Sequence, residues 1–236
     1  MRRAPFDLDE SLINRLSPFR QLKGSEVREI LDHATSRRYD AGAAVFQEAA
    51  PAEHFFLLLD GYIRVLRTTE HGEQVIVLHI PAGELFGFAP AVGRTEYPAT
   101  AVAAAECVVL SWPTSLFDIF SSTYEGFMAD THRTVGNRMG EMHQRIVELS
   151  TLHVEQRVAS ALLRLVESSG RETERGIEID FPLTRRDLAE LTATTLHTVS
   201  RLLTAWERDG VVMGGRRRVV VCDRARLAQL ANDIRP

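Results

Sequence analysis

The sequence contains only two cysteines, Cys107 and Cys222, and neither has a second cysteine or a histidine nearby at the spacing of a metal finger. Neither a disulfide framework nor a zinc finger is therefore expected. We expect each cysteine to be a small buried hydrophobic residue. Lysine is nearly absent as well, since Lys23 is the only lysine among the 28 basic residues. We attribute this scarcity to a composition bias of the source genome.

Long hydrophobic runs are also missing. The run from His54 to Leu59 is closed by Asp60, far short of the roughly 18 to 20 apolar residues that a membrane-spanning helix needs. The first residues carry charge but lack the apolar stretch of a secretion signal. The sequence therefore predicts a cytoplasmic protein that does not associate with a membrane.

The composition is typical of a globular protein with more than one domain. The 236 residues are 44% hydrophobic and 25% charged, which allows a buried core and favours one large and one small domain. Residues 1–150 carry 14 basic and 20 acidic side chains, whereas residues 151–236 carry 14 and 12. This basic excess at the C-terminal end does not by itself establish nucleic-acid binding, because binding needs a basic patch.

The periodicity of apolar residues changes along the chain. Over residues 8–37 they recur every three or four positions, which predicts helix. Over residues 39–112 they form short runs, and turn signals such as Asp60-Gly61 and Pro81-Ala82-Gly83 separate these runs. Turns at intervals of about ten residues predict an antiparallel sandwich or roll of about eighty residues.

From residue 128 the helical pattern becomes a heptad repeat. One row of residues with a spacing of seven runs from Met128 to Leu149, and a second row, from His132 to His153, interleaves with it. Such a pattern is typical of a two-stranded coiled coil, whereas a helix packed on its own domain has a broader apolar stripe. We therefore predict a dimerisation helix with contacts at Met128, Val135, Met139, Met142, Ile146 and Leu149.

Residues 182–212 predict two short helices joined by a tight turn. Thr184 can cap the first helix, with Asp187 in place of the usual Glu of a capping box, and Thr195 can cap the second. The turn is Thr192-Ala193-Thr194, and this arrangement matches a helix-turn-helix. In the second helix, Val199, Leu202, Leu203 and Trp206 are predicted to point inward and Leu196, His197, Ser200 and Arg201 outward.

The chemistry of this second helix suits DNA. Arg201 can reach guanine O6 and N7 in a bidentate contact, and the hydroxyls of Thr195 and Thr198 can hold a phosphate. Two strands follow around a Gly-Gly turn with three arginines at its tip, and such a wing can lie against the DNA backbone. The predicted DNA contacts are Arg185, Thr195, Leu196, His197, Thr198, Ser200, Arg201, Arg216, Arg217 and Arg218.

These features together resemble the CRP/FNR family of bacterial transcription regulators. The resemblance covers nearly the whole chain, and its best matches are Pro81-Ala82-Gly83-Glu84-Leu85-Phe86-Gly87 and Thr195-Leu196-His197-Thr198-Val199-Ser200-Arg201. It implies an α+β fold with a cyclic-nucleotide-binding-like β-roll, a double-stranded jelly roll, over residues 1–122. A long dimerisation helix with a hinge then follows over 123–152, and a winged helix-turn-helix over 153–236.

The resemblance also implies a homodimer that binds a near-palindromic site in double-stranded DNA and contacts RNA polymerase. At one position the chain departs from the FNR-type pattern, which has Glu two residues before the position of Val199, where this chain has His197. The preferred half-site therefore cannot be carried over from the family. We expect a two-state switch, in which a small effector in the roll changes the packing near Met142 and a hinge at residues 150–153 changes the spacing of the recognition helices.

Cyclic-nucleotide-binding members of the family follow the Gly-Glu-Leu turn with an Arg-Ser pair that holds the cyclic phosphate, and Tyr97-Pro98 stands in that place here. Without the guanidinium a phosphate loses a charge-assisted contact, so cyclic AMP is disfavoured. A cyclic-nucleotide-responsive regulator is the alternative. An iron–sulfur cluster is excluded because no cysteine precedes Cys107. The predicted effector pocket comprises Gly83, Glu84, Leu85, Tyr97, Pro98, Thr100, Met142 and His143.

The residues from Tyr97 to Ala101 and the helix-turn-helix motif resemble the Dnr/NnrR branch of the family, whose members respond to nitrogen oxides through haem. Haem would need an axial ligand, and His143 is the first candidate, because it occupies a helix position that meets the ligand in relatives. A lone histidine on a polar helix face is more often merely solvated, so both readings stay open. The other histidines near the roll and the helix are His33, His54, His71, His79 and His132.

A metal enzyme is the remaining alternative, because a β-roll of this size also resembles the cupin barrel. A cupin site needs two or three histidines and a carboxylate from adjacent strands. His71 and His79 have Glu73 and Glu84 nearby, but the close His-x-His pair expected of cupins is missing. We therefore predict no catalytic residue and no metal site.

Overall fold

The computed structural model describes residues 16–72 and 74–232. The chain divides into two compact units, and the first comprises residues up to Thr68 together with Val77–Gly140. The second comprises Thr69–Ile76 and the residues from Glu141 onward. Residues 69–76, which follow strand β4 (Tyr62–Thr68) and include the first residues of strand β5 (Gln74–Pro81), are thus grouped with the C-terminal part of the chain.

The N-terminal part is less helical than its sequence pattern predicted. After the 3-10 helix η1 (Ser17–Phe19), helix α2 (Gly24–Asp32) ends well before Arg37, and strand β1 (Thr35–Tyr39) begins. The helix prediction was therefore wrong for residues 35–37, and its part before residue 16 lies outside the described residues. Strand β1 pairs antiparallel with a distant strand, from Thr35 opposite Ser111 to Tyr39 opposite Cys107, so long-range pairing overrides the local period.

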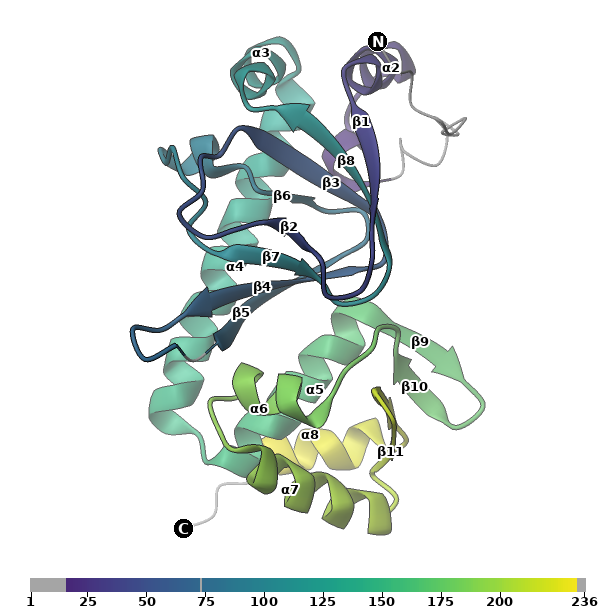
Figure 1. The fold of residues 1–236 in the computed structure, drawn as a ribbon. Helices are drawn as coiled ribbons and strands as arrows, with labels where there is room; N and C mark the ends of the chain where they lie inside the picture. Colours follow the sequence, from purple (N-terminus) through teal and green to yellow (C-terminus); the bar gives the residue numbers. More distant parts are fainter. Residues whose placement is uncertain (1–15, 73, 233–236) are drawn as a thin grey trace. The chain divides into compact units, whose positions relative to one another are not determined.

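The first unit contains the predicted β-roll, whose two four-stranded sheets have the orders β1-β8-β3-β6 and β2-β7-β4-β5 (Figure 1). A bulge in β3 shifts its register against β8 between Leu58 and Asp60. The other elements of this part are β2 (Ala44–Phe46), β3 (His54–Asp60), β4 (Tyr62–Thr68), β5 (Gln74–Pro81), β6 (Leu85–Phe86), η2 (Ala89–Val92), β7 (Thr100–Ala103), β8 (Cys107–Pro113) and α3 (Ser115–Thr123).

Buried aromatic side chains join the helices of the first unit to its sheet. Phe55 stacks on Trp112 with ring centroids 5.3 Å apart, and Phe117 meets Phe55 edge-on at 5.4 Å. The indole N–H of Trp112 donates to the carbonyl of Ile30 in α2 at 2.8 Å. Because full burial of such a side chain contributes roughly 1.5 to 3 kcal/mol, this cluster fixes α2 and α3 against the roll.

Helix α4 (Glu125–Thr151) and helix α5 (Val154–Ser169) follow. The interruption between them lies within the hinge predicted at residues 150–153, and the backbone N–H of His153 donates to Gln156 Oε1 at 2.8 Å at the start of α5. The division between the units falls inside α4, between Gly140 and Glu141. The first part of α4 therefore belongs with the roll and its last three turns with the second unit.

The second unit contains one four-stranded sheet of order β11-β12-β10-β9 and a group of helices. The chain leaves α5 directly into a strand at Gly170, because β9 pairs with β10 from Gly170 opposite Ile179. The elements are β9 (Gly170–Thr173), β10 (Gly176–Ile179), α6 (Arg185–Leu191), α7 (Leu196–Arg208), β11 (Val212–Gly215), β12 (Arg218–Val221) and α8 (Arg224–Asn232).

The two cysteines differ in exposure. Cys107 is buried, as predicted, and burial raises the pKa of its thiol. The same prediction for Cys222 was wrong, because Cys222 follows the end of β12 and its side chain is exposed. Among the described helices, none combines the length and the apolar character needed to cross a bilayer.

Candidate nucleic-acid interface and effector region

Helix α6 begins with the predicted capping box. Thr184 Oγ1 accepts a hydrogen bond from the backbone N–H of Asp187 at 3.1 Å, and the Asp187 carboxylate accepts one from the backbone N–H of Thr184 at 2.8 Å. Leu188 and Ala189 form the buried face of the helix. The two reciprocal bonds satisfy N–H groups that a helix start leaves without partners, so they fix where α6 begins.

The turn between α6 and α7 is held by an arginine from α5. Arg157 donates to the carbonyls of Thr192 at 3.1 Å and Ala193 at 3.3 Å, and also to the carbonyl of Leu152 at 2.9 Å. Ala193 has φ +48°, a left-handed conformation that side chains other than glycine adopt at a cost. The three bonds to Arg157 tie the turn to the end of α4 and help to maintain this conformation.

A second arginine, Arg145 of α4, joins two further segments of the second unit. Its guanidinium donates to the carbonyl of Glu190 in α6 at 3.2 Å and to the carbonyl of Ile76 near the start of β5 at 2.8 Å. Burial lowers the pKa of Arg145, and Glu148 pairs with Arg164 beside it. Neither Arg145 nor Arg157 was among the predicted site residues, because most of their partners are distant in sequence and a backbone carbonyl acceptor leaves no pattern in the sequence.

Helix α7 has the predicted division into a buried and an exposed face. Val199, Leu203 and Trp206 are buried, while His197 and Arg201 are exposed. Leu202 and Ser200 are half-buried at the boundaries between the two faces. Leu196 is 42% exposed, although it is a large apolar residue.

The start of α7 is capped as predicted. Thr195 Oγ1 accepts from the backbone N–H of Thr198 at 3.1 Å, and the hydroxyls of these two residues lie within hydrogen-bonding distance of each other, at 2.9 Å. Both hydroxyls thus already have a partner before any phosphate arrives. The remaining N–H groups of the first turn are the stronger candidates for a phosphate contact.

Several positive side chains stay available on the surface of the second unit. Arg201 and Arg216 are exposed, and neither makes a hydrogen bond or an ion pair with any described residue. The same holds for Arg186 at the start of α6, which sequence analysis did not select. By contrast, Arg185 pairs with Glu207 at 3.1 Å and therefore links α6 to α7.

The wing has the predicted position but a different turn. Gly215 pairs with Arg218, so the turn residues are Arg216 and Arg217, and the Gly-Gly pair lies within β11. The predicted Gly-Gly turn was therefore wrong. A Cβ on Gly214 would displace the Glu207 carboxylate, which is the flexible end of its side chain.

One of the three wing arginines is engaged with a carboxylate. Arg218 donates to Glu178 of β10 at 2.6 Å, and Arg171 of β9 approaches the same carboxylate at 3.5 Å. The hydrogen bond from Arg218 is the main cause that lowers the pKa of Glu178. Arg217 lies at the turn with φ +63°. Because Arg218 is bound to Glu178 and Arg216 is exposed, Arg216 is the wing side chain that is most available to a phosphate backbone.

In the first unit, the predicted effector residues Glu84 and Leu85 are in contact with Arg138 of α4. The Arg138 guanidinium donates to the carbonyl of Leu85 at 2.7 Å, approaches Glu84 Oε2 at 3.3 Å and lies 5.0 Å from the centroid of the Phe88 ring. Gly83 has φ +90°, so this turn needs glycine. Arg138, which was not among the predicted site residues, ties the turn after β5 to the first part of α4.

Tyr97 lies inside the roll. Its ring stacks on Phe46 with centroids 3.9 Å apart, and its hydroxyl donates to the carbonyl of His54 at 2.7 Å. Burial raises the pKa of the hydroxyl. Phe56 and Phe86 extend the stack, with centroids 5.2 Å apart. Aromatic rings therefore occupy the interior of the roll next to the position where the family resemblance implied an Arg-Ser pair.

The remaining predicted effector residues of the first unit are Pro98 and Thr100. Pro98 is exposed, and the Thr100 hydroxyl accepts from the backbone N–H of Glu48 at 3.0 Å. Met142 and His143 belong to the second unit and are exposed.

No group of three or more His, Cys, Asp or Glu side chains that could hold a metal ion occurs among residues 16–72 and 74–232. Of the histidines considered as haem ligands, His33, His54, His71, His132 and His143 are exposed and His79 is half-buried.

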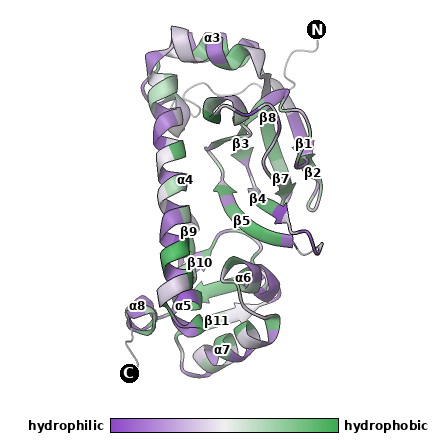
Figure 2. Ribbon diagram, turned by 90° about the vertical axis from the view of Figure 1, so that its left-hand side faces the viewer, coloured by the Kyte–Doolittle hydropathy of each residue, from purple (hydrophilic) through white to green (hydrophobic). Residues whose placement is uncertain are grey.

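The predicted dimerisation residues of α4 fall into two groups. Met128 and Val135 are half-buried, and Val135 packs against the core cluster of the first unit. The other four are between 44% and 66% exposed, and hydrophobic residues recur along this helix between hydrophilic ones (Figure 2). The exposed group consists of Met139, Met142, Ile146 and Leu149, at successive spacings of three, four and three.

Both units match known families. Residues 36–124 match the cyclic nucleotide-binding domain, and residues 156–230 match the Crp-like helix-turn-helix domain. The chain is 29% identical over 220 residues to the cyclic AMP receptor protein of Thermus thermophilus, covering 90% of this chain and 95% of that protein. It is 25% identical over 231 residues to the fumarate and nitrate reduction regulatory protein of Vibrio cholerae, covering 96% of this chain and 85% of that protein.

Solved structures share the fold. FixK2 from Bradyrhizobium japonicum superposes with a TM-score of 0.74 at 22% identity, over 84% of this chain and 96% of that chain. The similar proteins are regulators of transcription and not enzymes. The alternative of a cupin-like metal enzyme is therefore wrong.

Proposed function

This chain belongs to the CRP/FNR family of DNA-binding transcription regulators, and from that premise we propose that it acts as a homodimer in the cytoplasm. In this proposal the dimer places its two α7 helices in successive major grooves of a near-palindromic site and contacts RNA polymerase there. The observation that carries the proposal is the face of α7 on which His197 and Arg201 stand exposed without a partner among the described residues. A recognition helix reads bases with such side chains.

The exposed stripe on α4 supports the dimer. Met139, Met142, Ile146 and Leu149 expose apolar area at the alternating spacing of a coiled coil. A contiguous apolar stripe of this kind marks an interaction site when it occurs on a soluble protein. A second copy of the same helix offers a matching stripe, and the two-fold symmetry of a dimer matches the symmetry of a near-palindrome.

The dimer is tested by reversing the polarity of the stripe. We expect Ile146→Arg to produce monomers in sedimentation at micromolar concentration and to abolish retention of duplex fragments in gel shifts. Ile119→Arg is the matched control, since Ile119 is 53% exposed on α3 and outside the stripe. Should Ile146→Arg sediment and bind as the unmodified chain does, the proposed interface is contradicted.

We also propose that a small effector in the roll sets the DNA affinity through α4 and the hinge at residues 150–153. Tyr97 supports an effector other than a cyclic nucleotide, because its buried, stacked ring stands where a phosphate-binding arginine is expected. The name of the Thermus thermophilus relative keeps cyclic AMP as the alternative. Calorimetric titration with cyclic AMP is expected to give no binding heat, and saturable micromolar binding would contradict this choice.

A response to nitrogen oxides through haem is our hypothesis for the effector. The Vibrio cholerae relative is named for nitrate reduction, and a haem ligand would come from exposed imidazoles such as His143. Reconstitution with haem tests the hypothesis: the Soret band should shift, and His143→Ala should prevent the shift while His132→Ala, on the same helix, should not. Spectra identical to those of free haem would remove haem from the account.

A further inference from the structure

Leu196 is in an unusual environment for a leucine. It is the first residue of α7 and precedes Leu203 by seven positions, so the two side chains leave the helix in nearly the same direction. Leu203 is 2% exposed, whereas Leu196 is 42% exposed. The hydrophobic core therefore covers Leu203 but not Leu196 at the start of the helix. Leu196 exposes apolar surface on the first turn of α7, where a ligand can contact it.

In a major groove that surface has one apolar partner. The C5 methyl group of thymine is the only aliphatic group on the base edges there, while the other base edges present N–H and C=O groups. Covering those polar groups with a leucine would remove them from water without giving them a hydrogen bond, which is unfavourable. Packing on a methyl group instead removes apolar surface of both partners from water.

The distance to Arg201 places this contact within the half-site. Leu196 and Arg201 are five residues apart on one helix, which corresponds to about 7.5 Å along its axis at about 1.5 Å per residue. Base pairs are stacked about 3.4 Å apart. Two contacts separated in this way fall about two base-pair steps apart when the helix follows the groove.

We propose that Leu196 determines specificity by packing on a thymine C5 methyl, about two base pairs from the guanine that Arg201 binds in each half-site. This inference rests on the proposed function and deepens it. It assigns a thymine to the base pair that Leu196 faces, which the hydrogen-bonding side chains of α7 would not specify. His197 lies between the two contacts on the same exposed face, and its imidazole reads the intervening edge.

The test removes only the methyl group. A duplex selected by the unmodified protein from a random library is remade with deoxyuridine in place of each thymidine in turn. At one symmetric position per half-site, we expect the affinity to fall about fourfold, and about fifteenfold when both half-sites are changed, as follows from roughly 0.8 kcal/mol for one buried methyl. The Leu196→Ala chain should bind the thymine and uracil duplexes equally.

Ile119→Ala is the control, because it removes a similar exposed aliphatic side chain from α3 in the other unit and should keep the fourfold difference. Retention of the fourfold difference by Leu196→Ala would overturn the proposal, and so would a selected site in which no thymine is sensitive to uracil. A chain that selects no duplex at all would overturn the proposed function as well, so the two failures are distinguishable.

Discussion

The residues predicted to contact ligands have intramolecular partners in the roll but are exposed on the recognition helix of the second unit. In the roll, Tyr97 is buried and stacked and Glu84 approaches Arg138, so these groups already have intramolecular partners. In the second unit, His197 and Arg201 are exposed and without partners among the described residues. The proposed DNA-binding face therefore needs no rearrangement of side-chain partners before it meets DNA, whereas the effector that we propose for the roll would have to replace existing contacts with its own.

The largest effect that would test this contrast is expected inside the roll. Tyr97→Ala removes a buried ring that stacks at 3.9 Å on Phe46 and should lower the free energy of unfolding by about 3 to 5 kcal/mol. Denaturant titration measures the change. Tyr97→Phe, which removes only the hydroxyl that donates to His54, should cost about 1 to 2 kcal/mol. If both variants leave the free energy of unfolding almost unchanged, the Tyr97 ring does not fill the interior of the roll.

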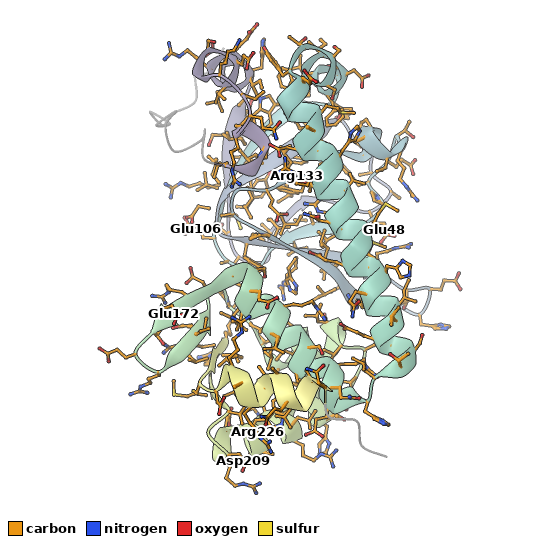
Figure 3. The ribbon with its side chains drawn as sticks, turned by 180° about the vertical axis from the view of Figure 1, so that it is seen from behind. Glu48, Glu106, Arg133, Glu172, Asp209 and Arg226 are labelled. Atoms are coloured by element: carbon orange, nitrogen blue, oxygen red, sulfur yellow. The ribbon has the colours of Figure 1, made fainter. Side chains whose placement is uncertain are left out.

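A smaller loss is expected at the turn of the helix-turn-helix. Arg157→Met removes three hydrogen bonds to the carbonyls of Leu152, Thr192 and Ala193 and should cost about 2 kcal/mol. Backbone amides around residues 192–194 should then exchange faster with solvent. Arg226→Met on α8 (labelled in Figure 3) is the control, because Arg226 is exposed and its guanidinium donates to Gln229 of the same helix. Unchanged exchange in the turn would contradict the role given to Arg157.

The third prediction concerns the exposed face itself. Arg201→Ala should weaken binding to the selected site by about 1 to 3 kcal/mol and relax the preference for one base per half-site. The free energy of unfolding should be unaffected, since this exposed side chain makes no hydrogen bond or ion pair with a described residue. Arg208→Ala, at the other end of the same helix beside Asp209 (Figure 3), is the matched control. If Arg201→Ala weakens binding to selected and random duplexes equally, Arg201 contacts phosphate and not a base.

The smallest effect is expected at the wing. Glu178 holds Arg218 at 2.6 Å, so Glu178→Gln should leave Arg218 free to meet a phosphate. We expect about threefold tighter binding to all duplexes and a steeper dependence on salt. Arg218 lowers the folded-state pKa of Glu178. The ion pair therefore stabilises the fold at pH values above the ordinary pKa of a carboxyl group, and this stabilisation is lost as the pH falls through the lowered pKa. Weaker binding by Glu178→Gln would contradict this arrangement.

How much the sequence could predict depends on how local each interaction is. The capping bonds of Thr184 and Thr195 join residues three positions apart, and both helix starts were predicted correctly. The aromatic stack of the roll brings Phe46, Phe86 and Tyr97 together from separate parts of the chain, and no local pattern indicates it. The helix prediction for residues 35–37 was wrong for the same reason, because these residues belong to strand β1 and its pairing with β8 is long-range.

Arginine illustrates the same limit within one unit. Sequence position correctly marked Arg201 as exposed, because the faces of a helix follow from its period. It selected Arg185, which pairs with Glu207, as a DNA contact and not Arg186, which stays available. Whether a cation meets a carboxylate depends on the approach of a second helix, and that approach is a property of the fold.

We expect two copies of the chain to present twin recognition helices to one duplex, and the stoichiometry of the complex reports whether they do. Native mass spectrometry of the protein with its selected duplex should give two chains per duplex. Insertion of five base pairs between the half-sites rotates one groove by about half a turn, and we expect it to lower the affinity at least tenfold. One chain per duplex, with an affinity unchanged by the insertion, would contradict the account.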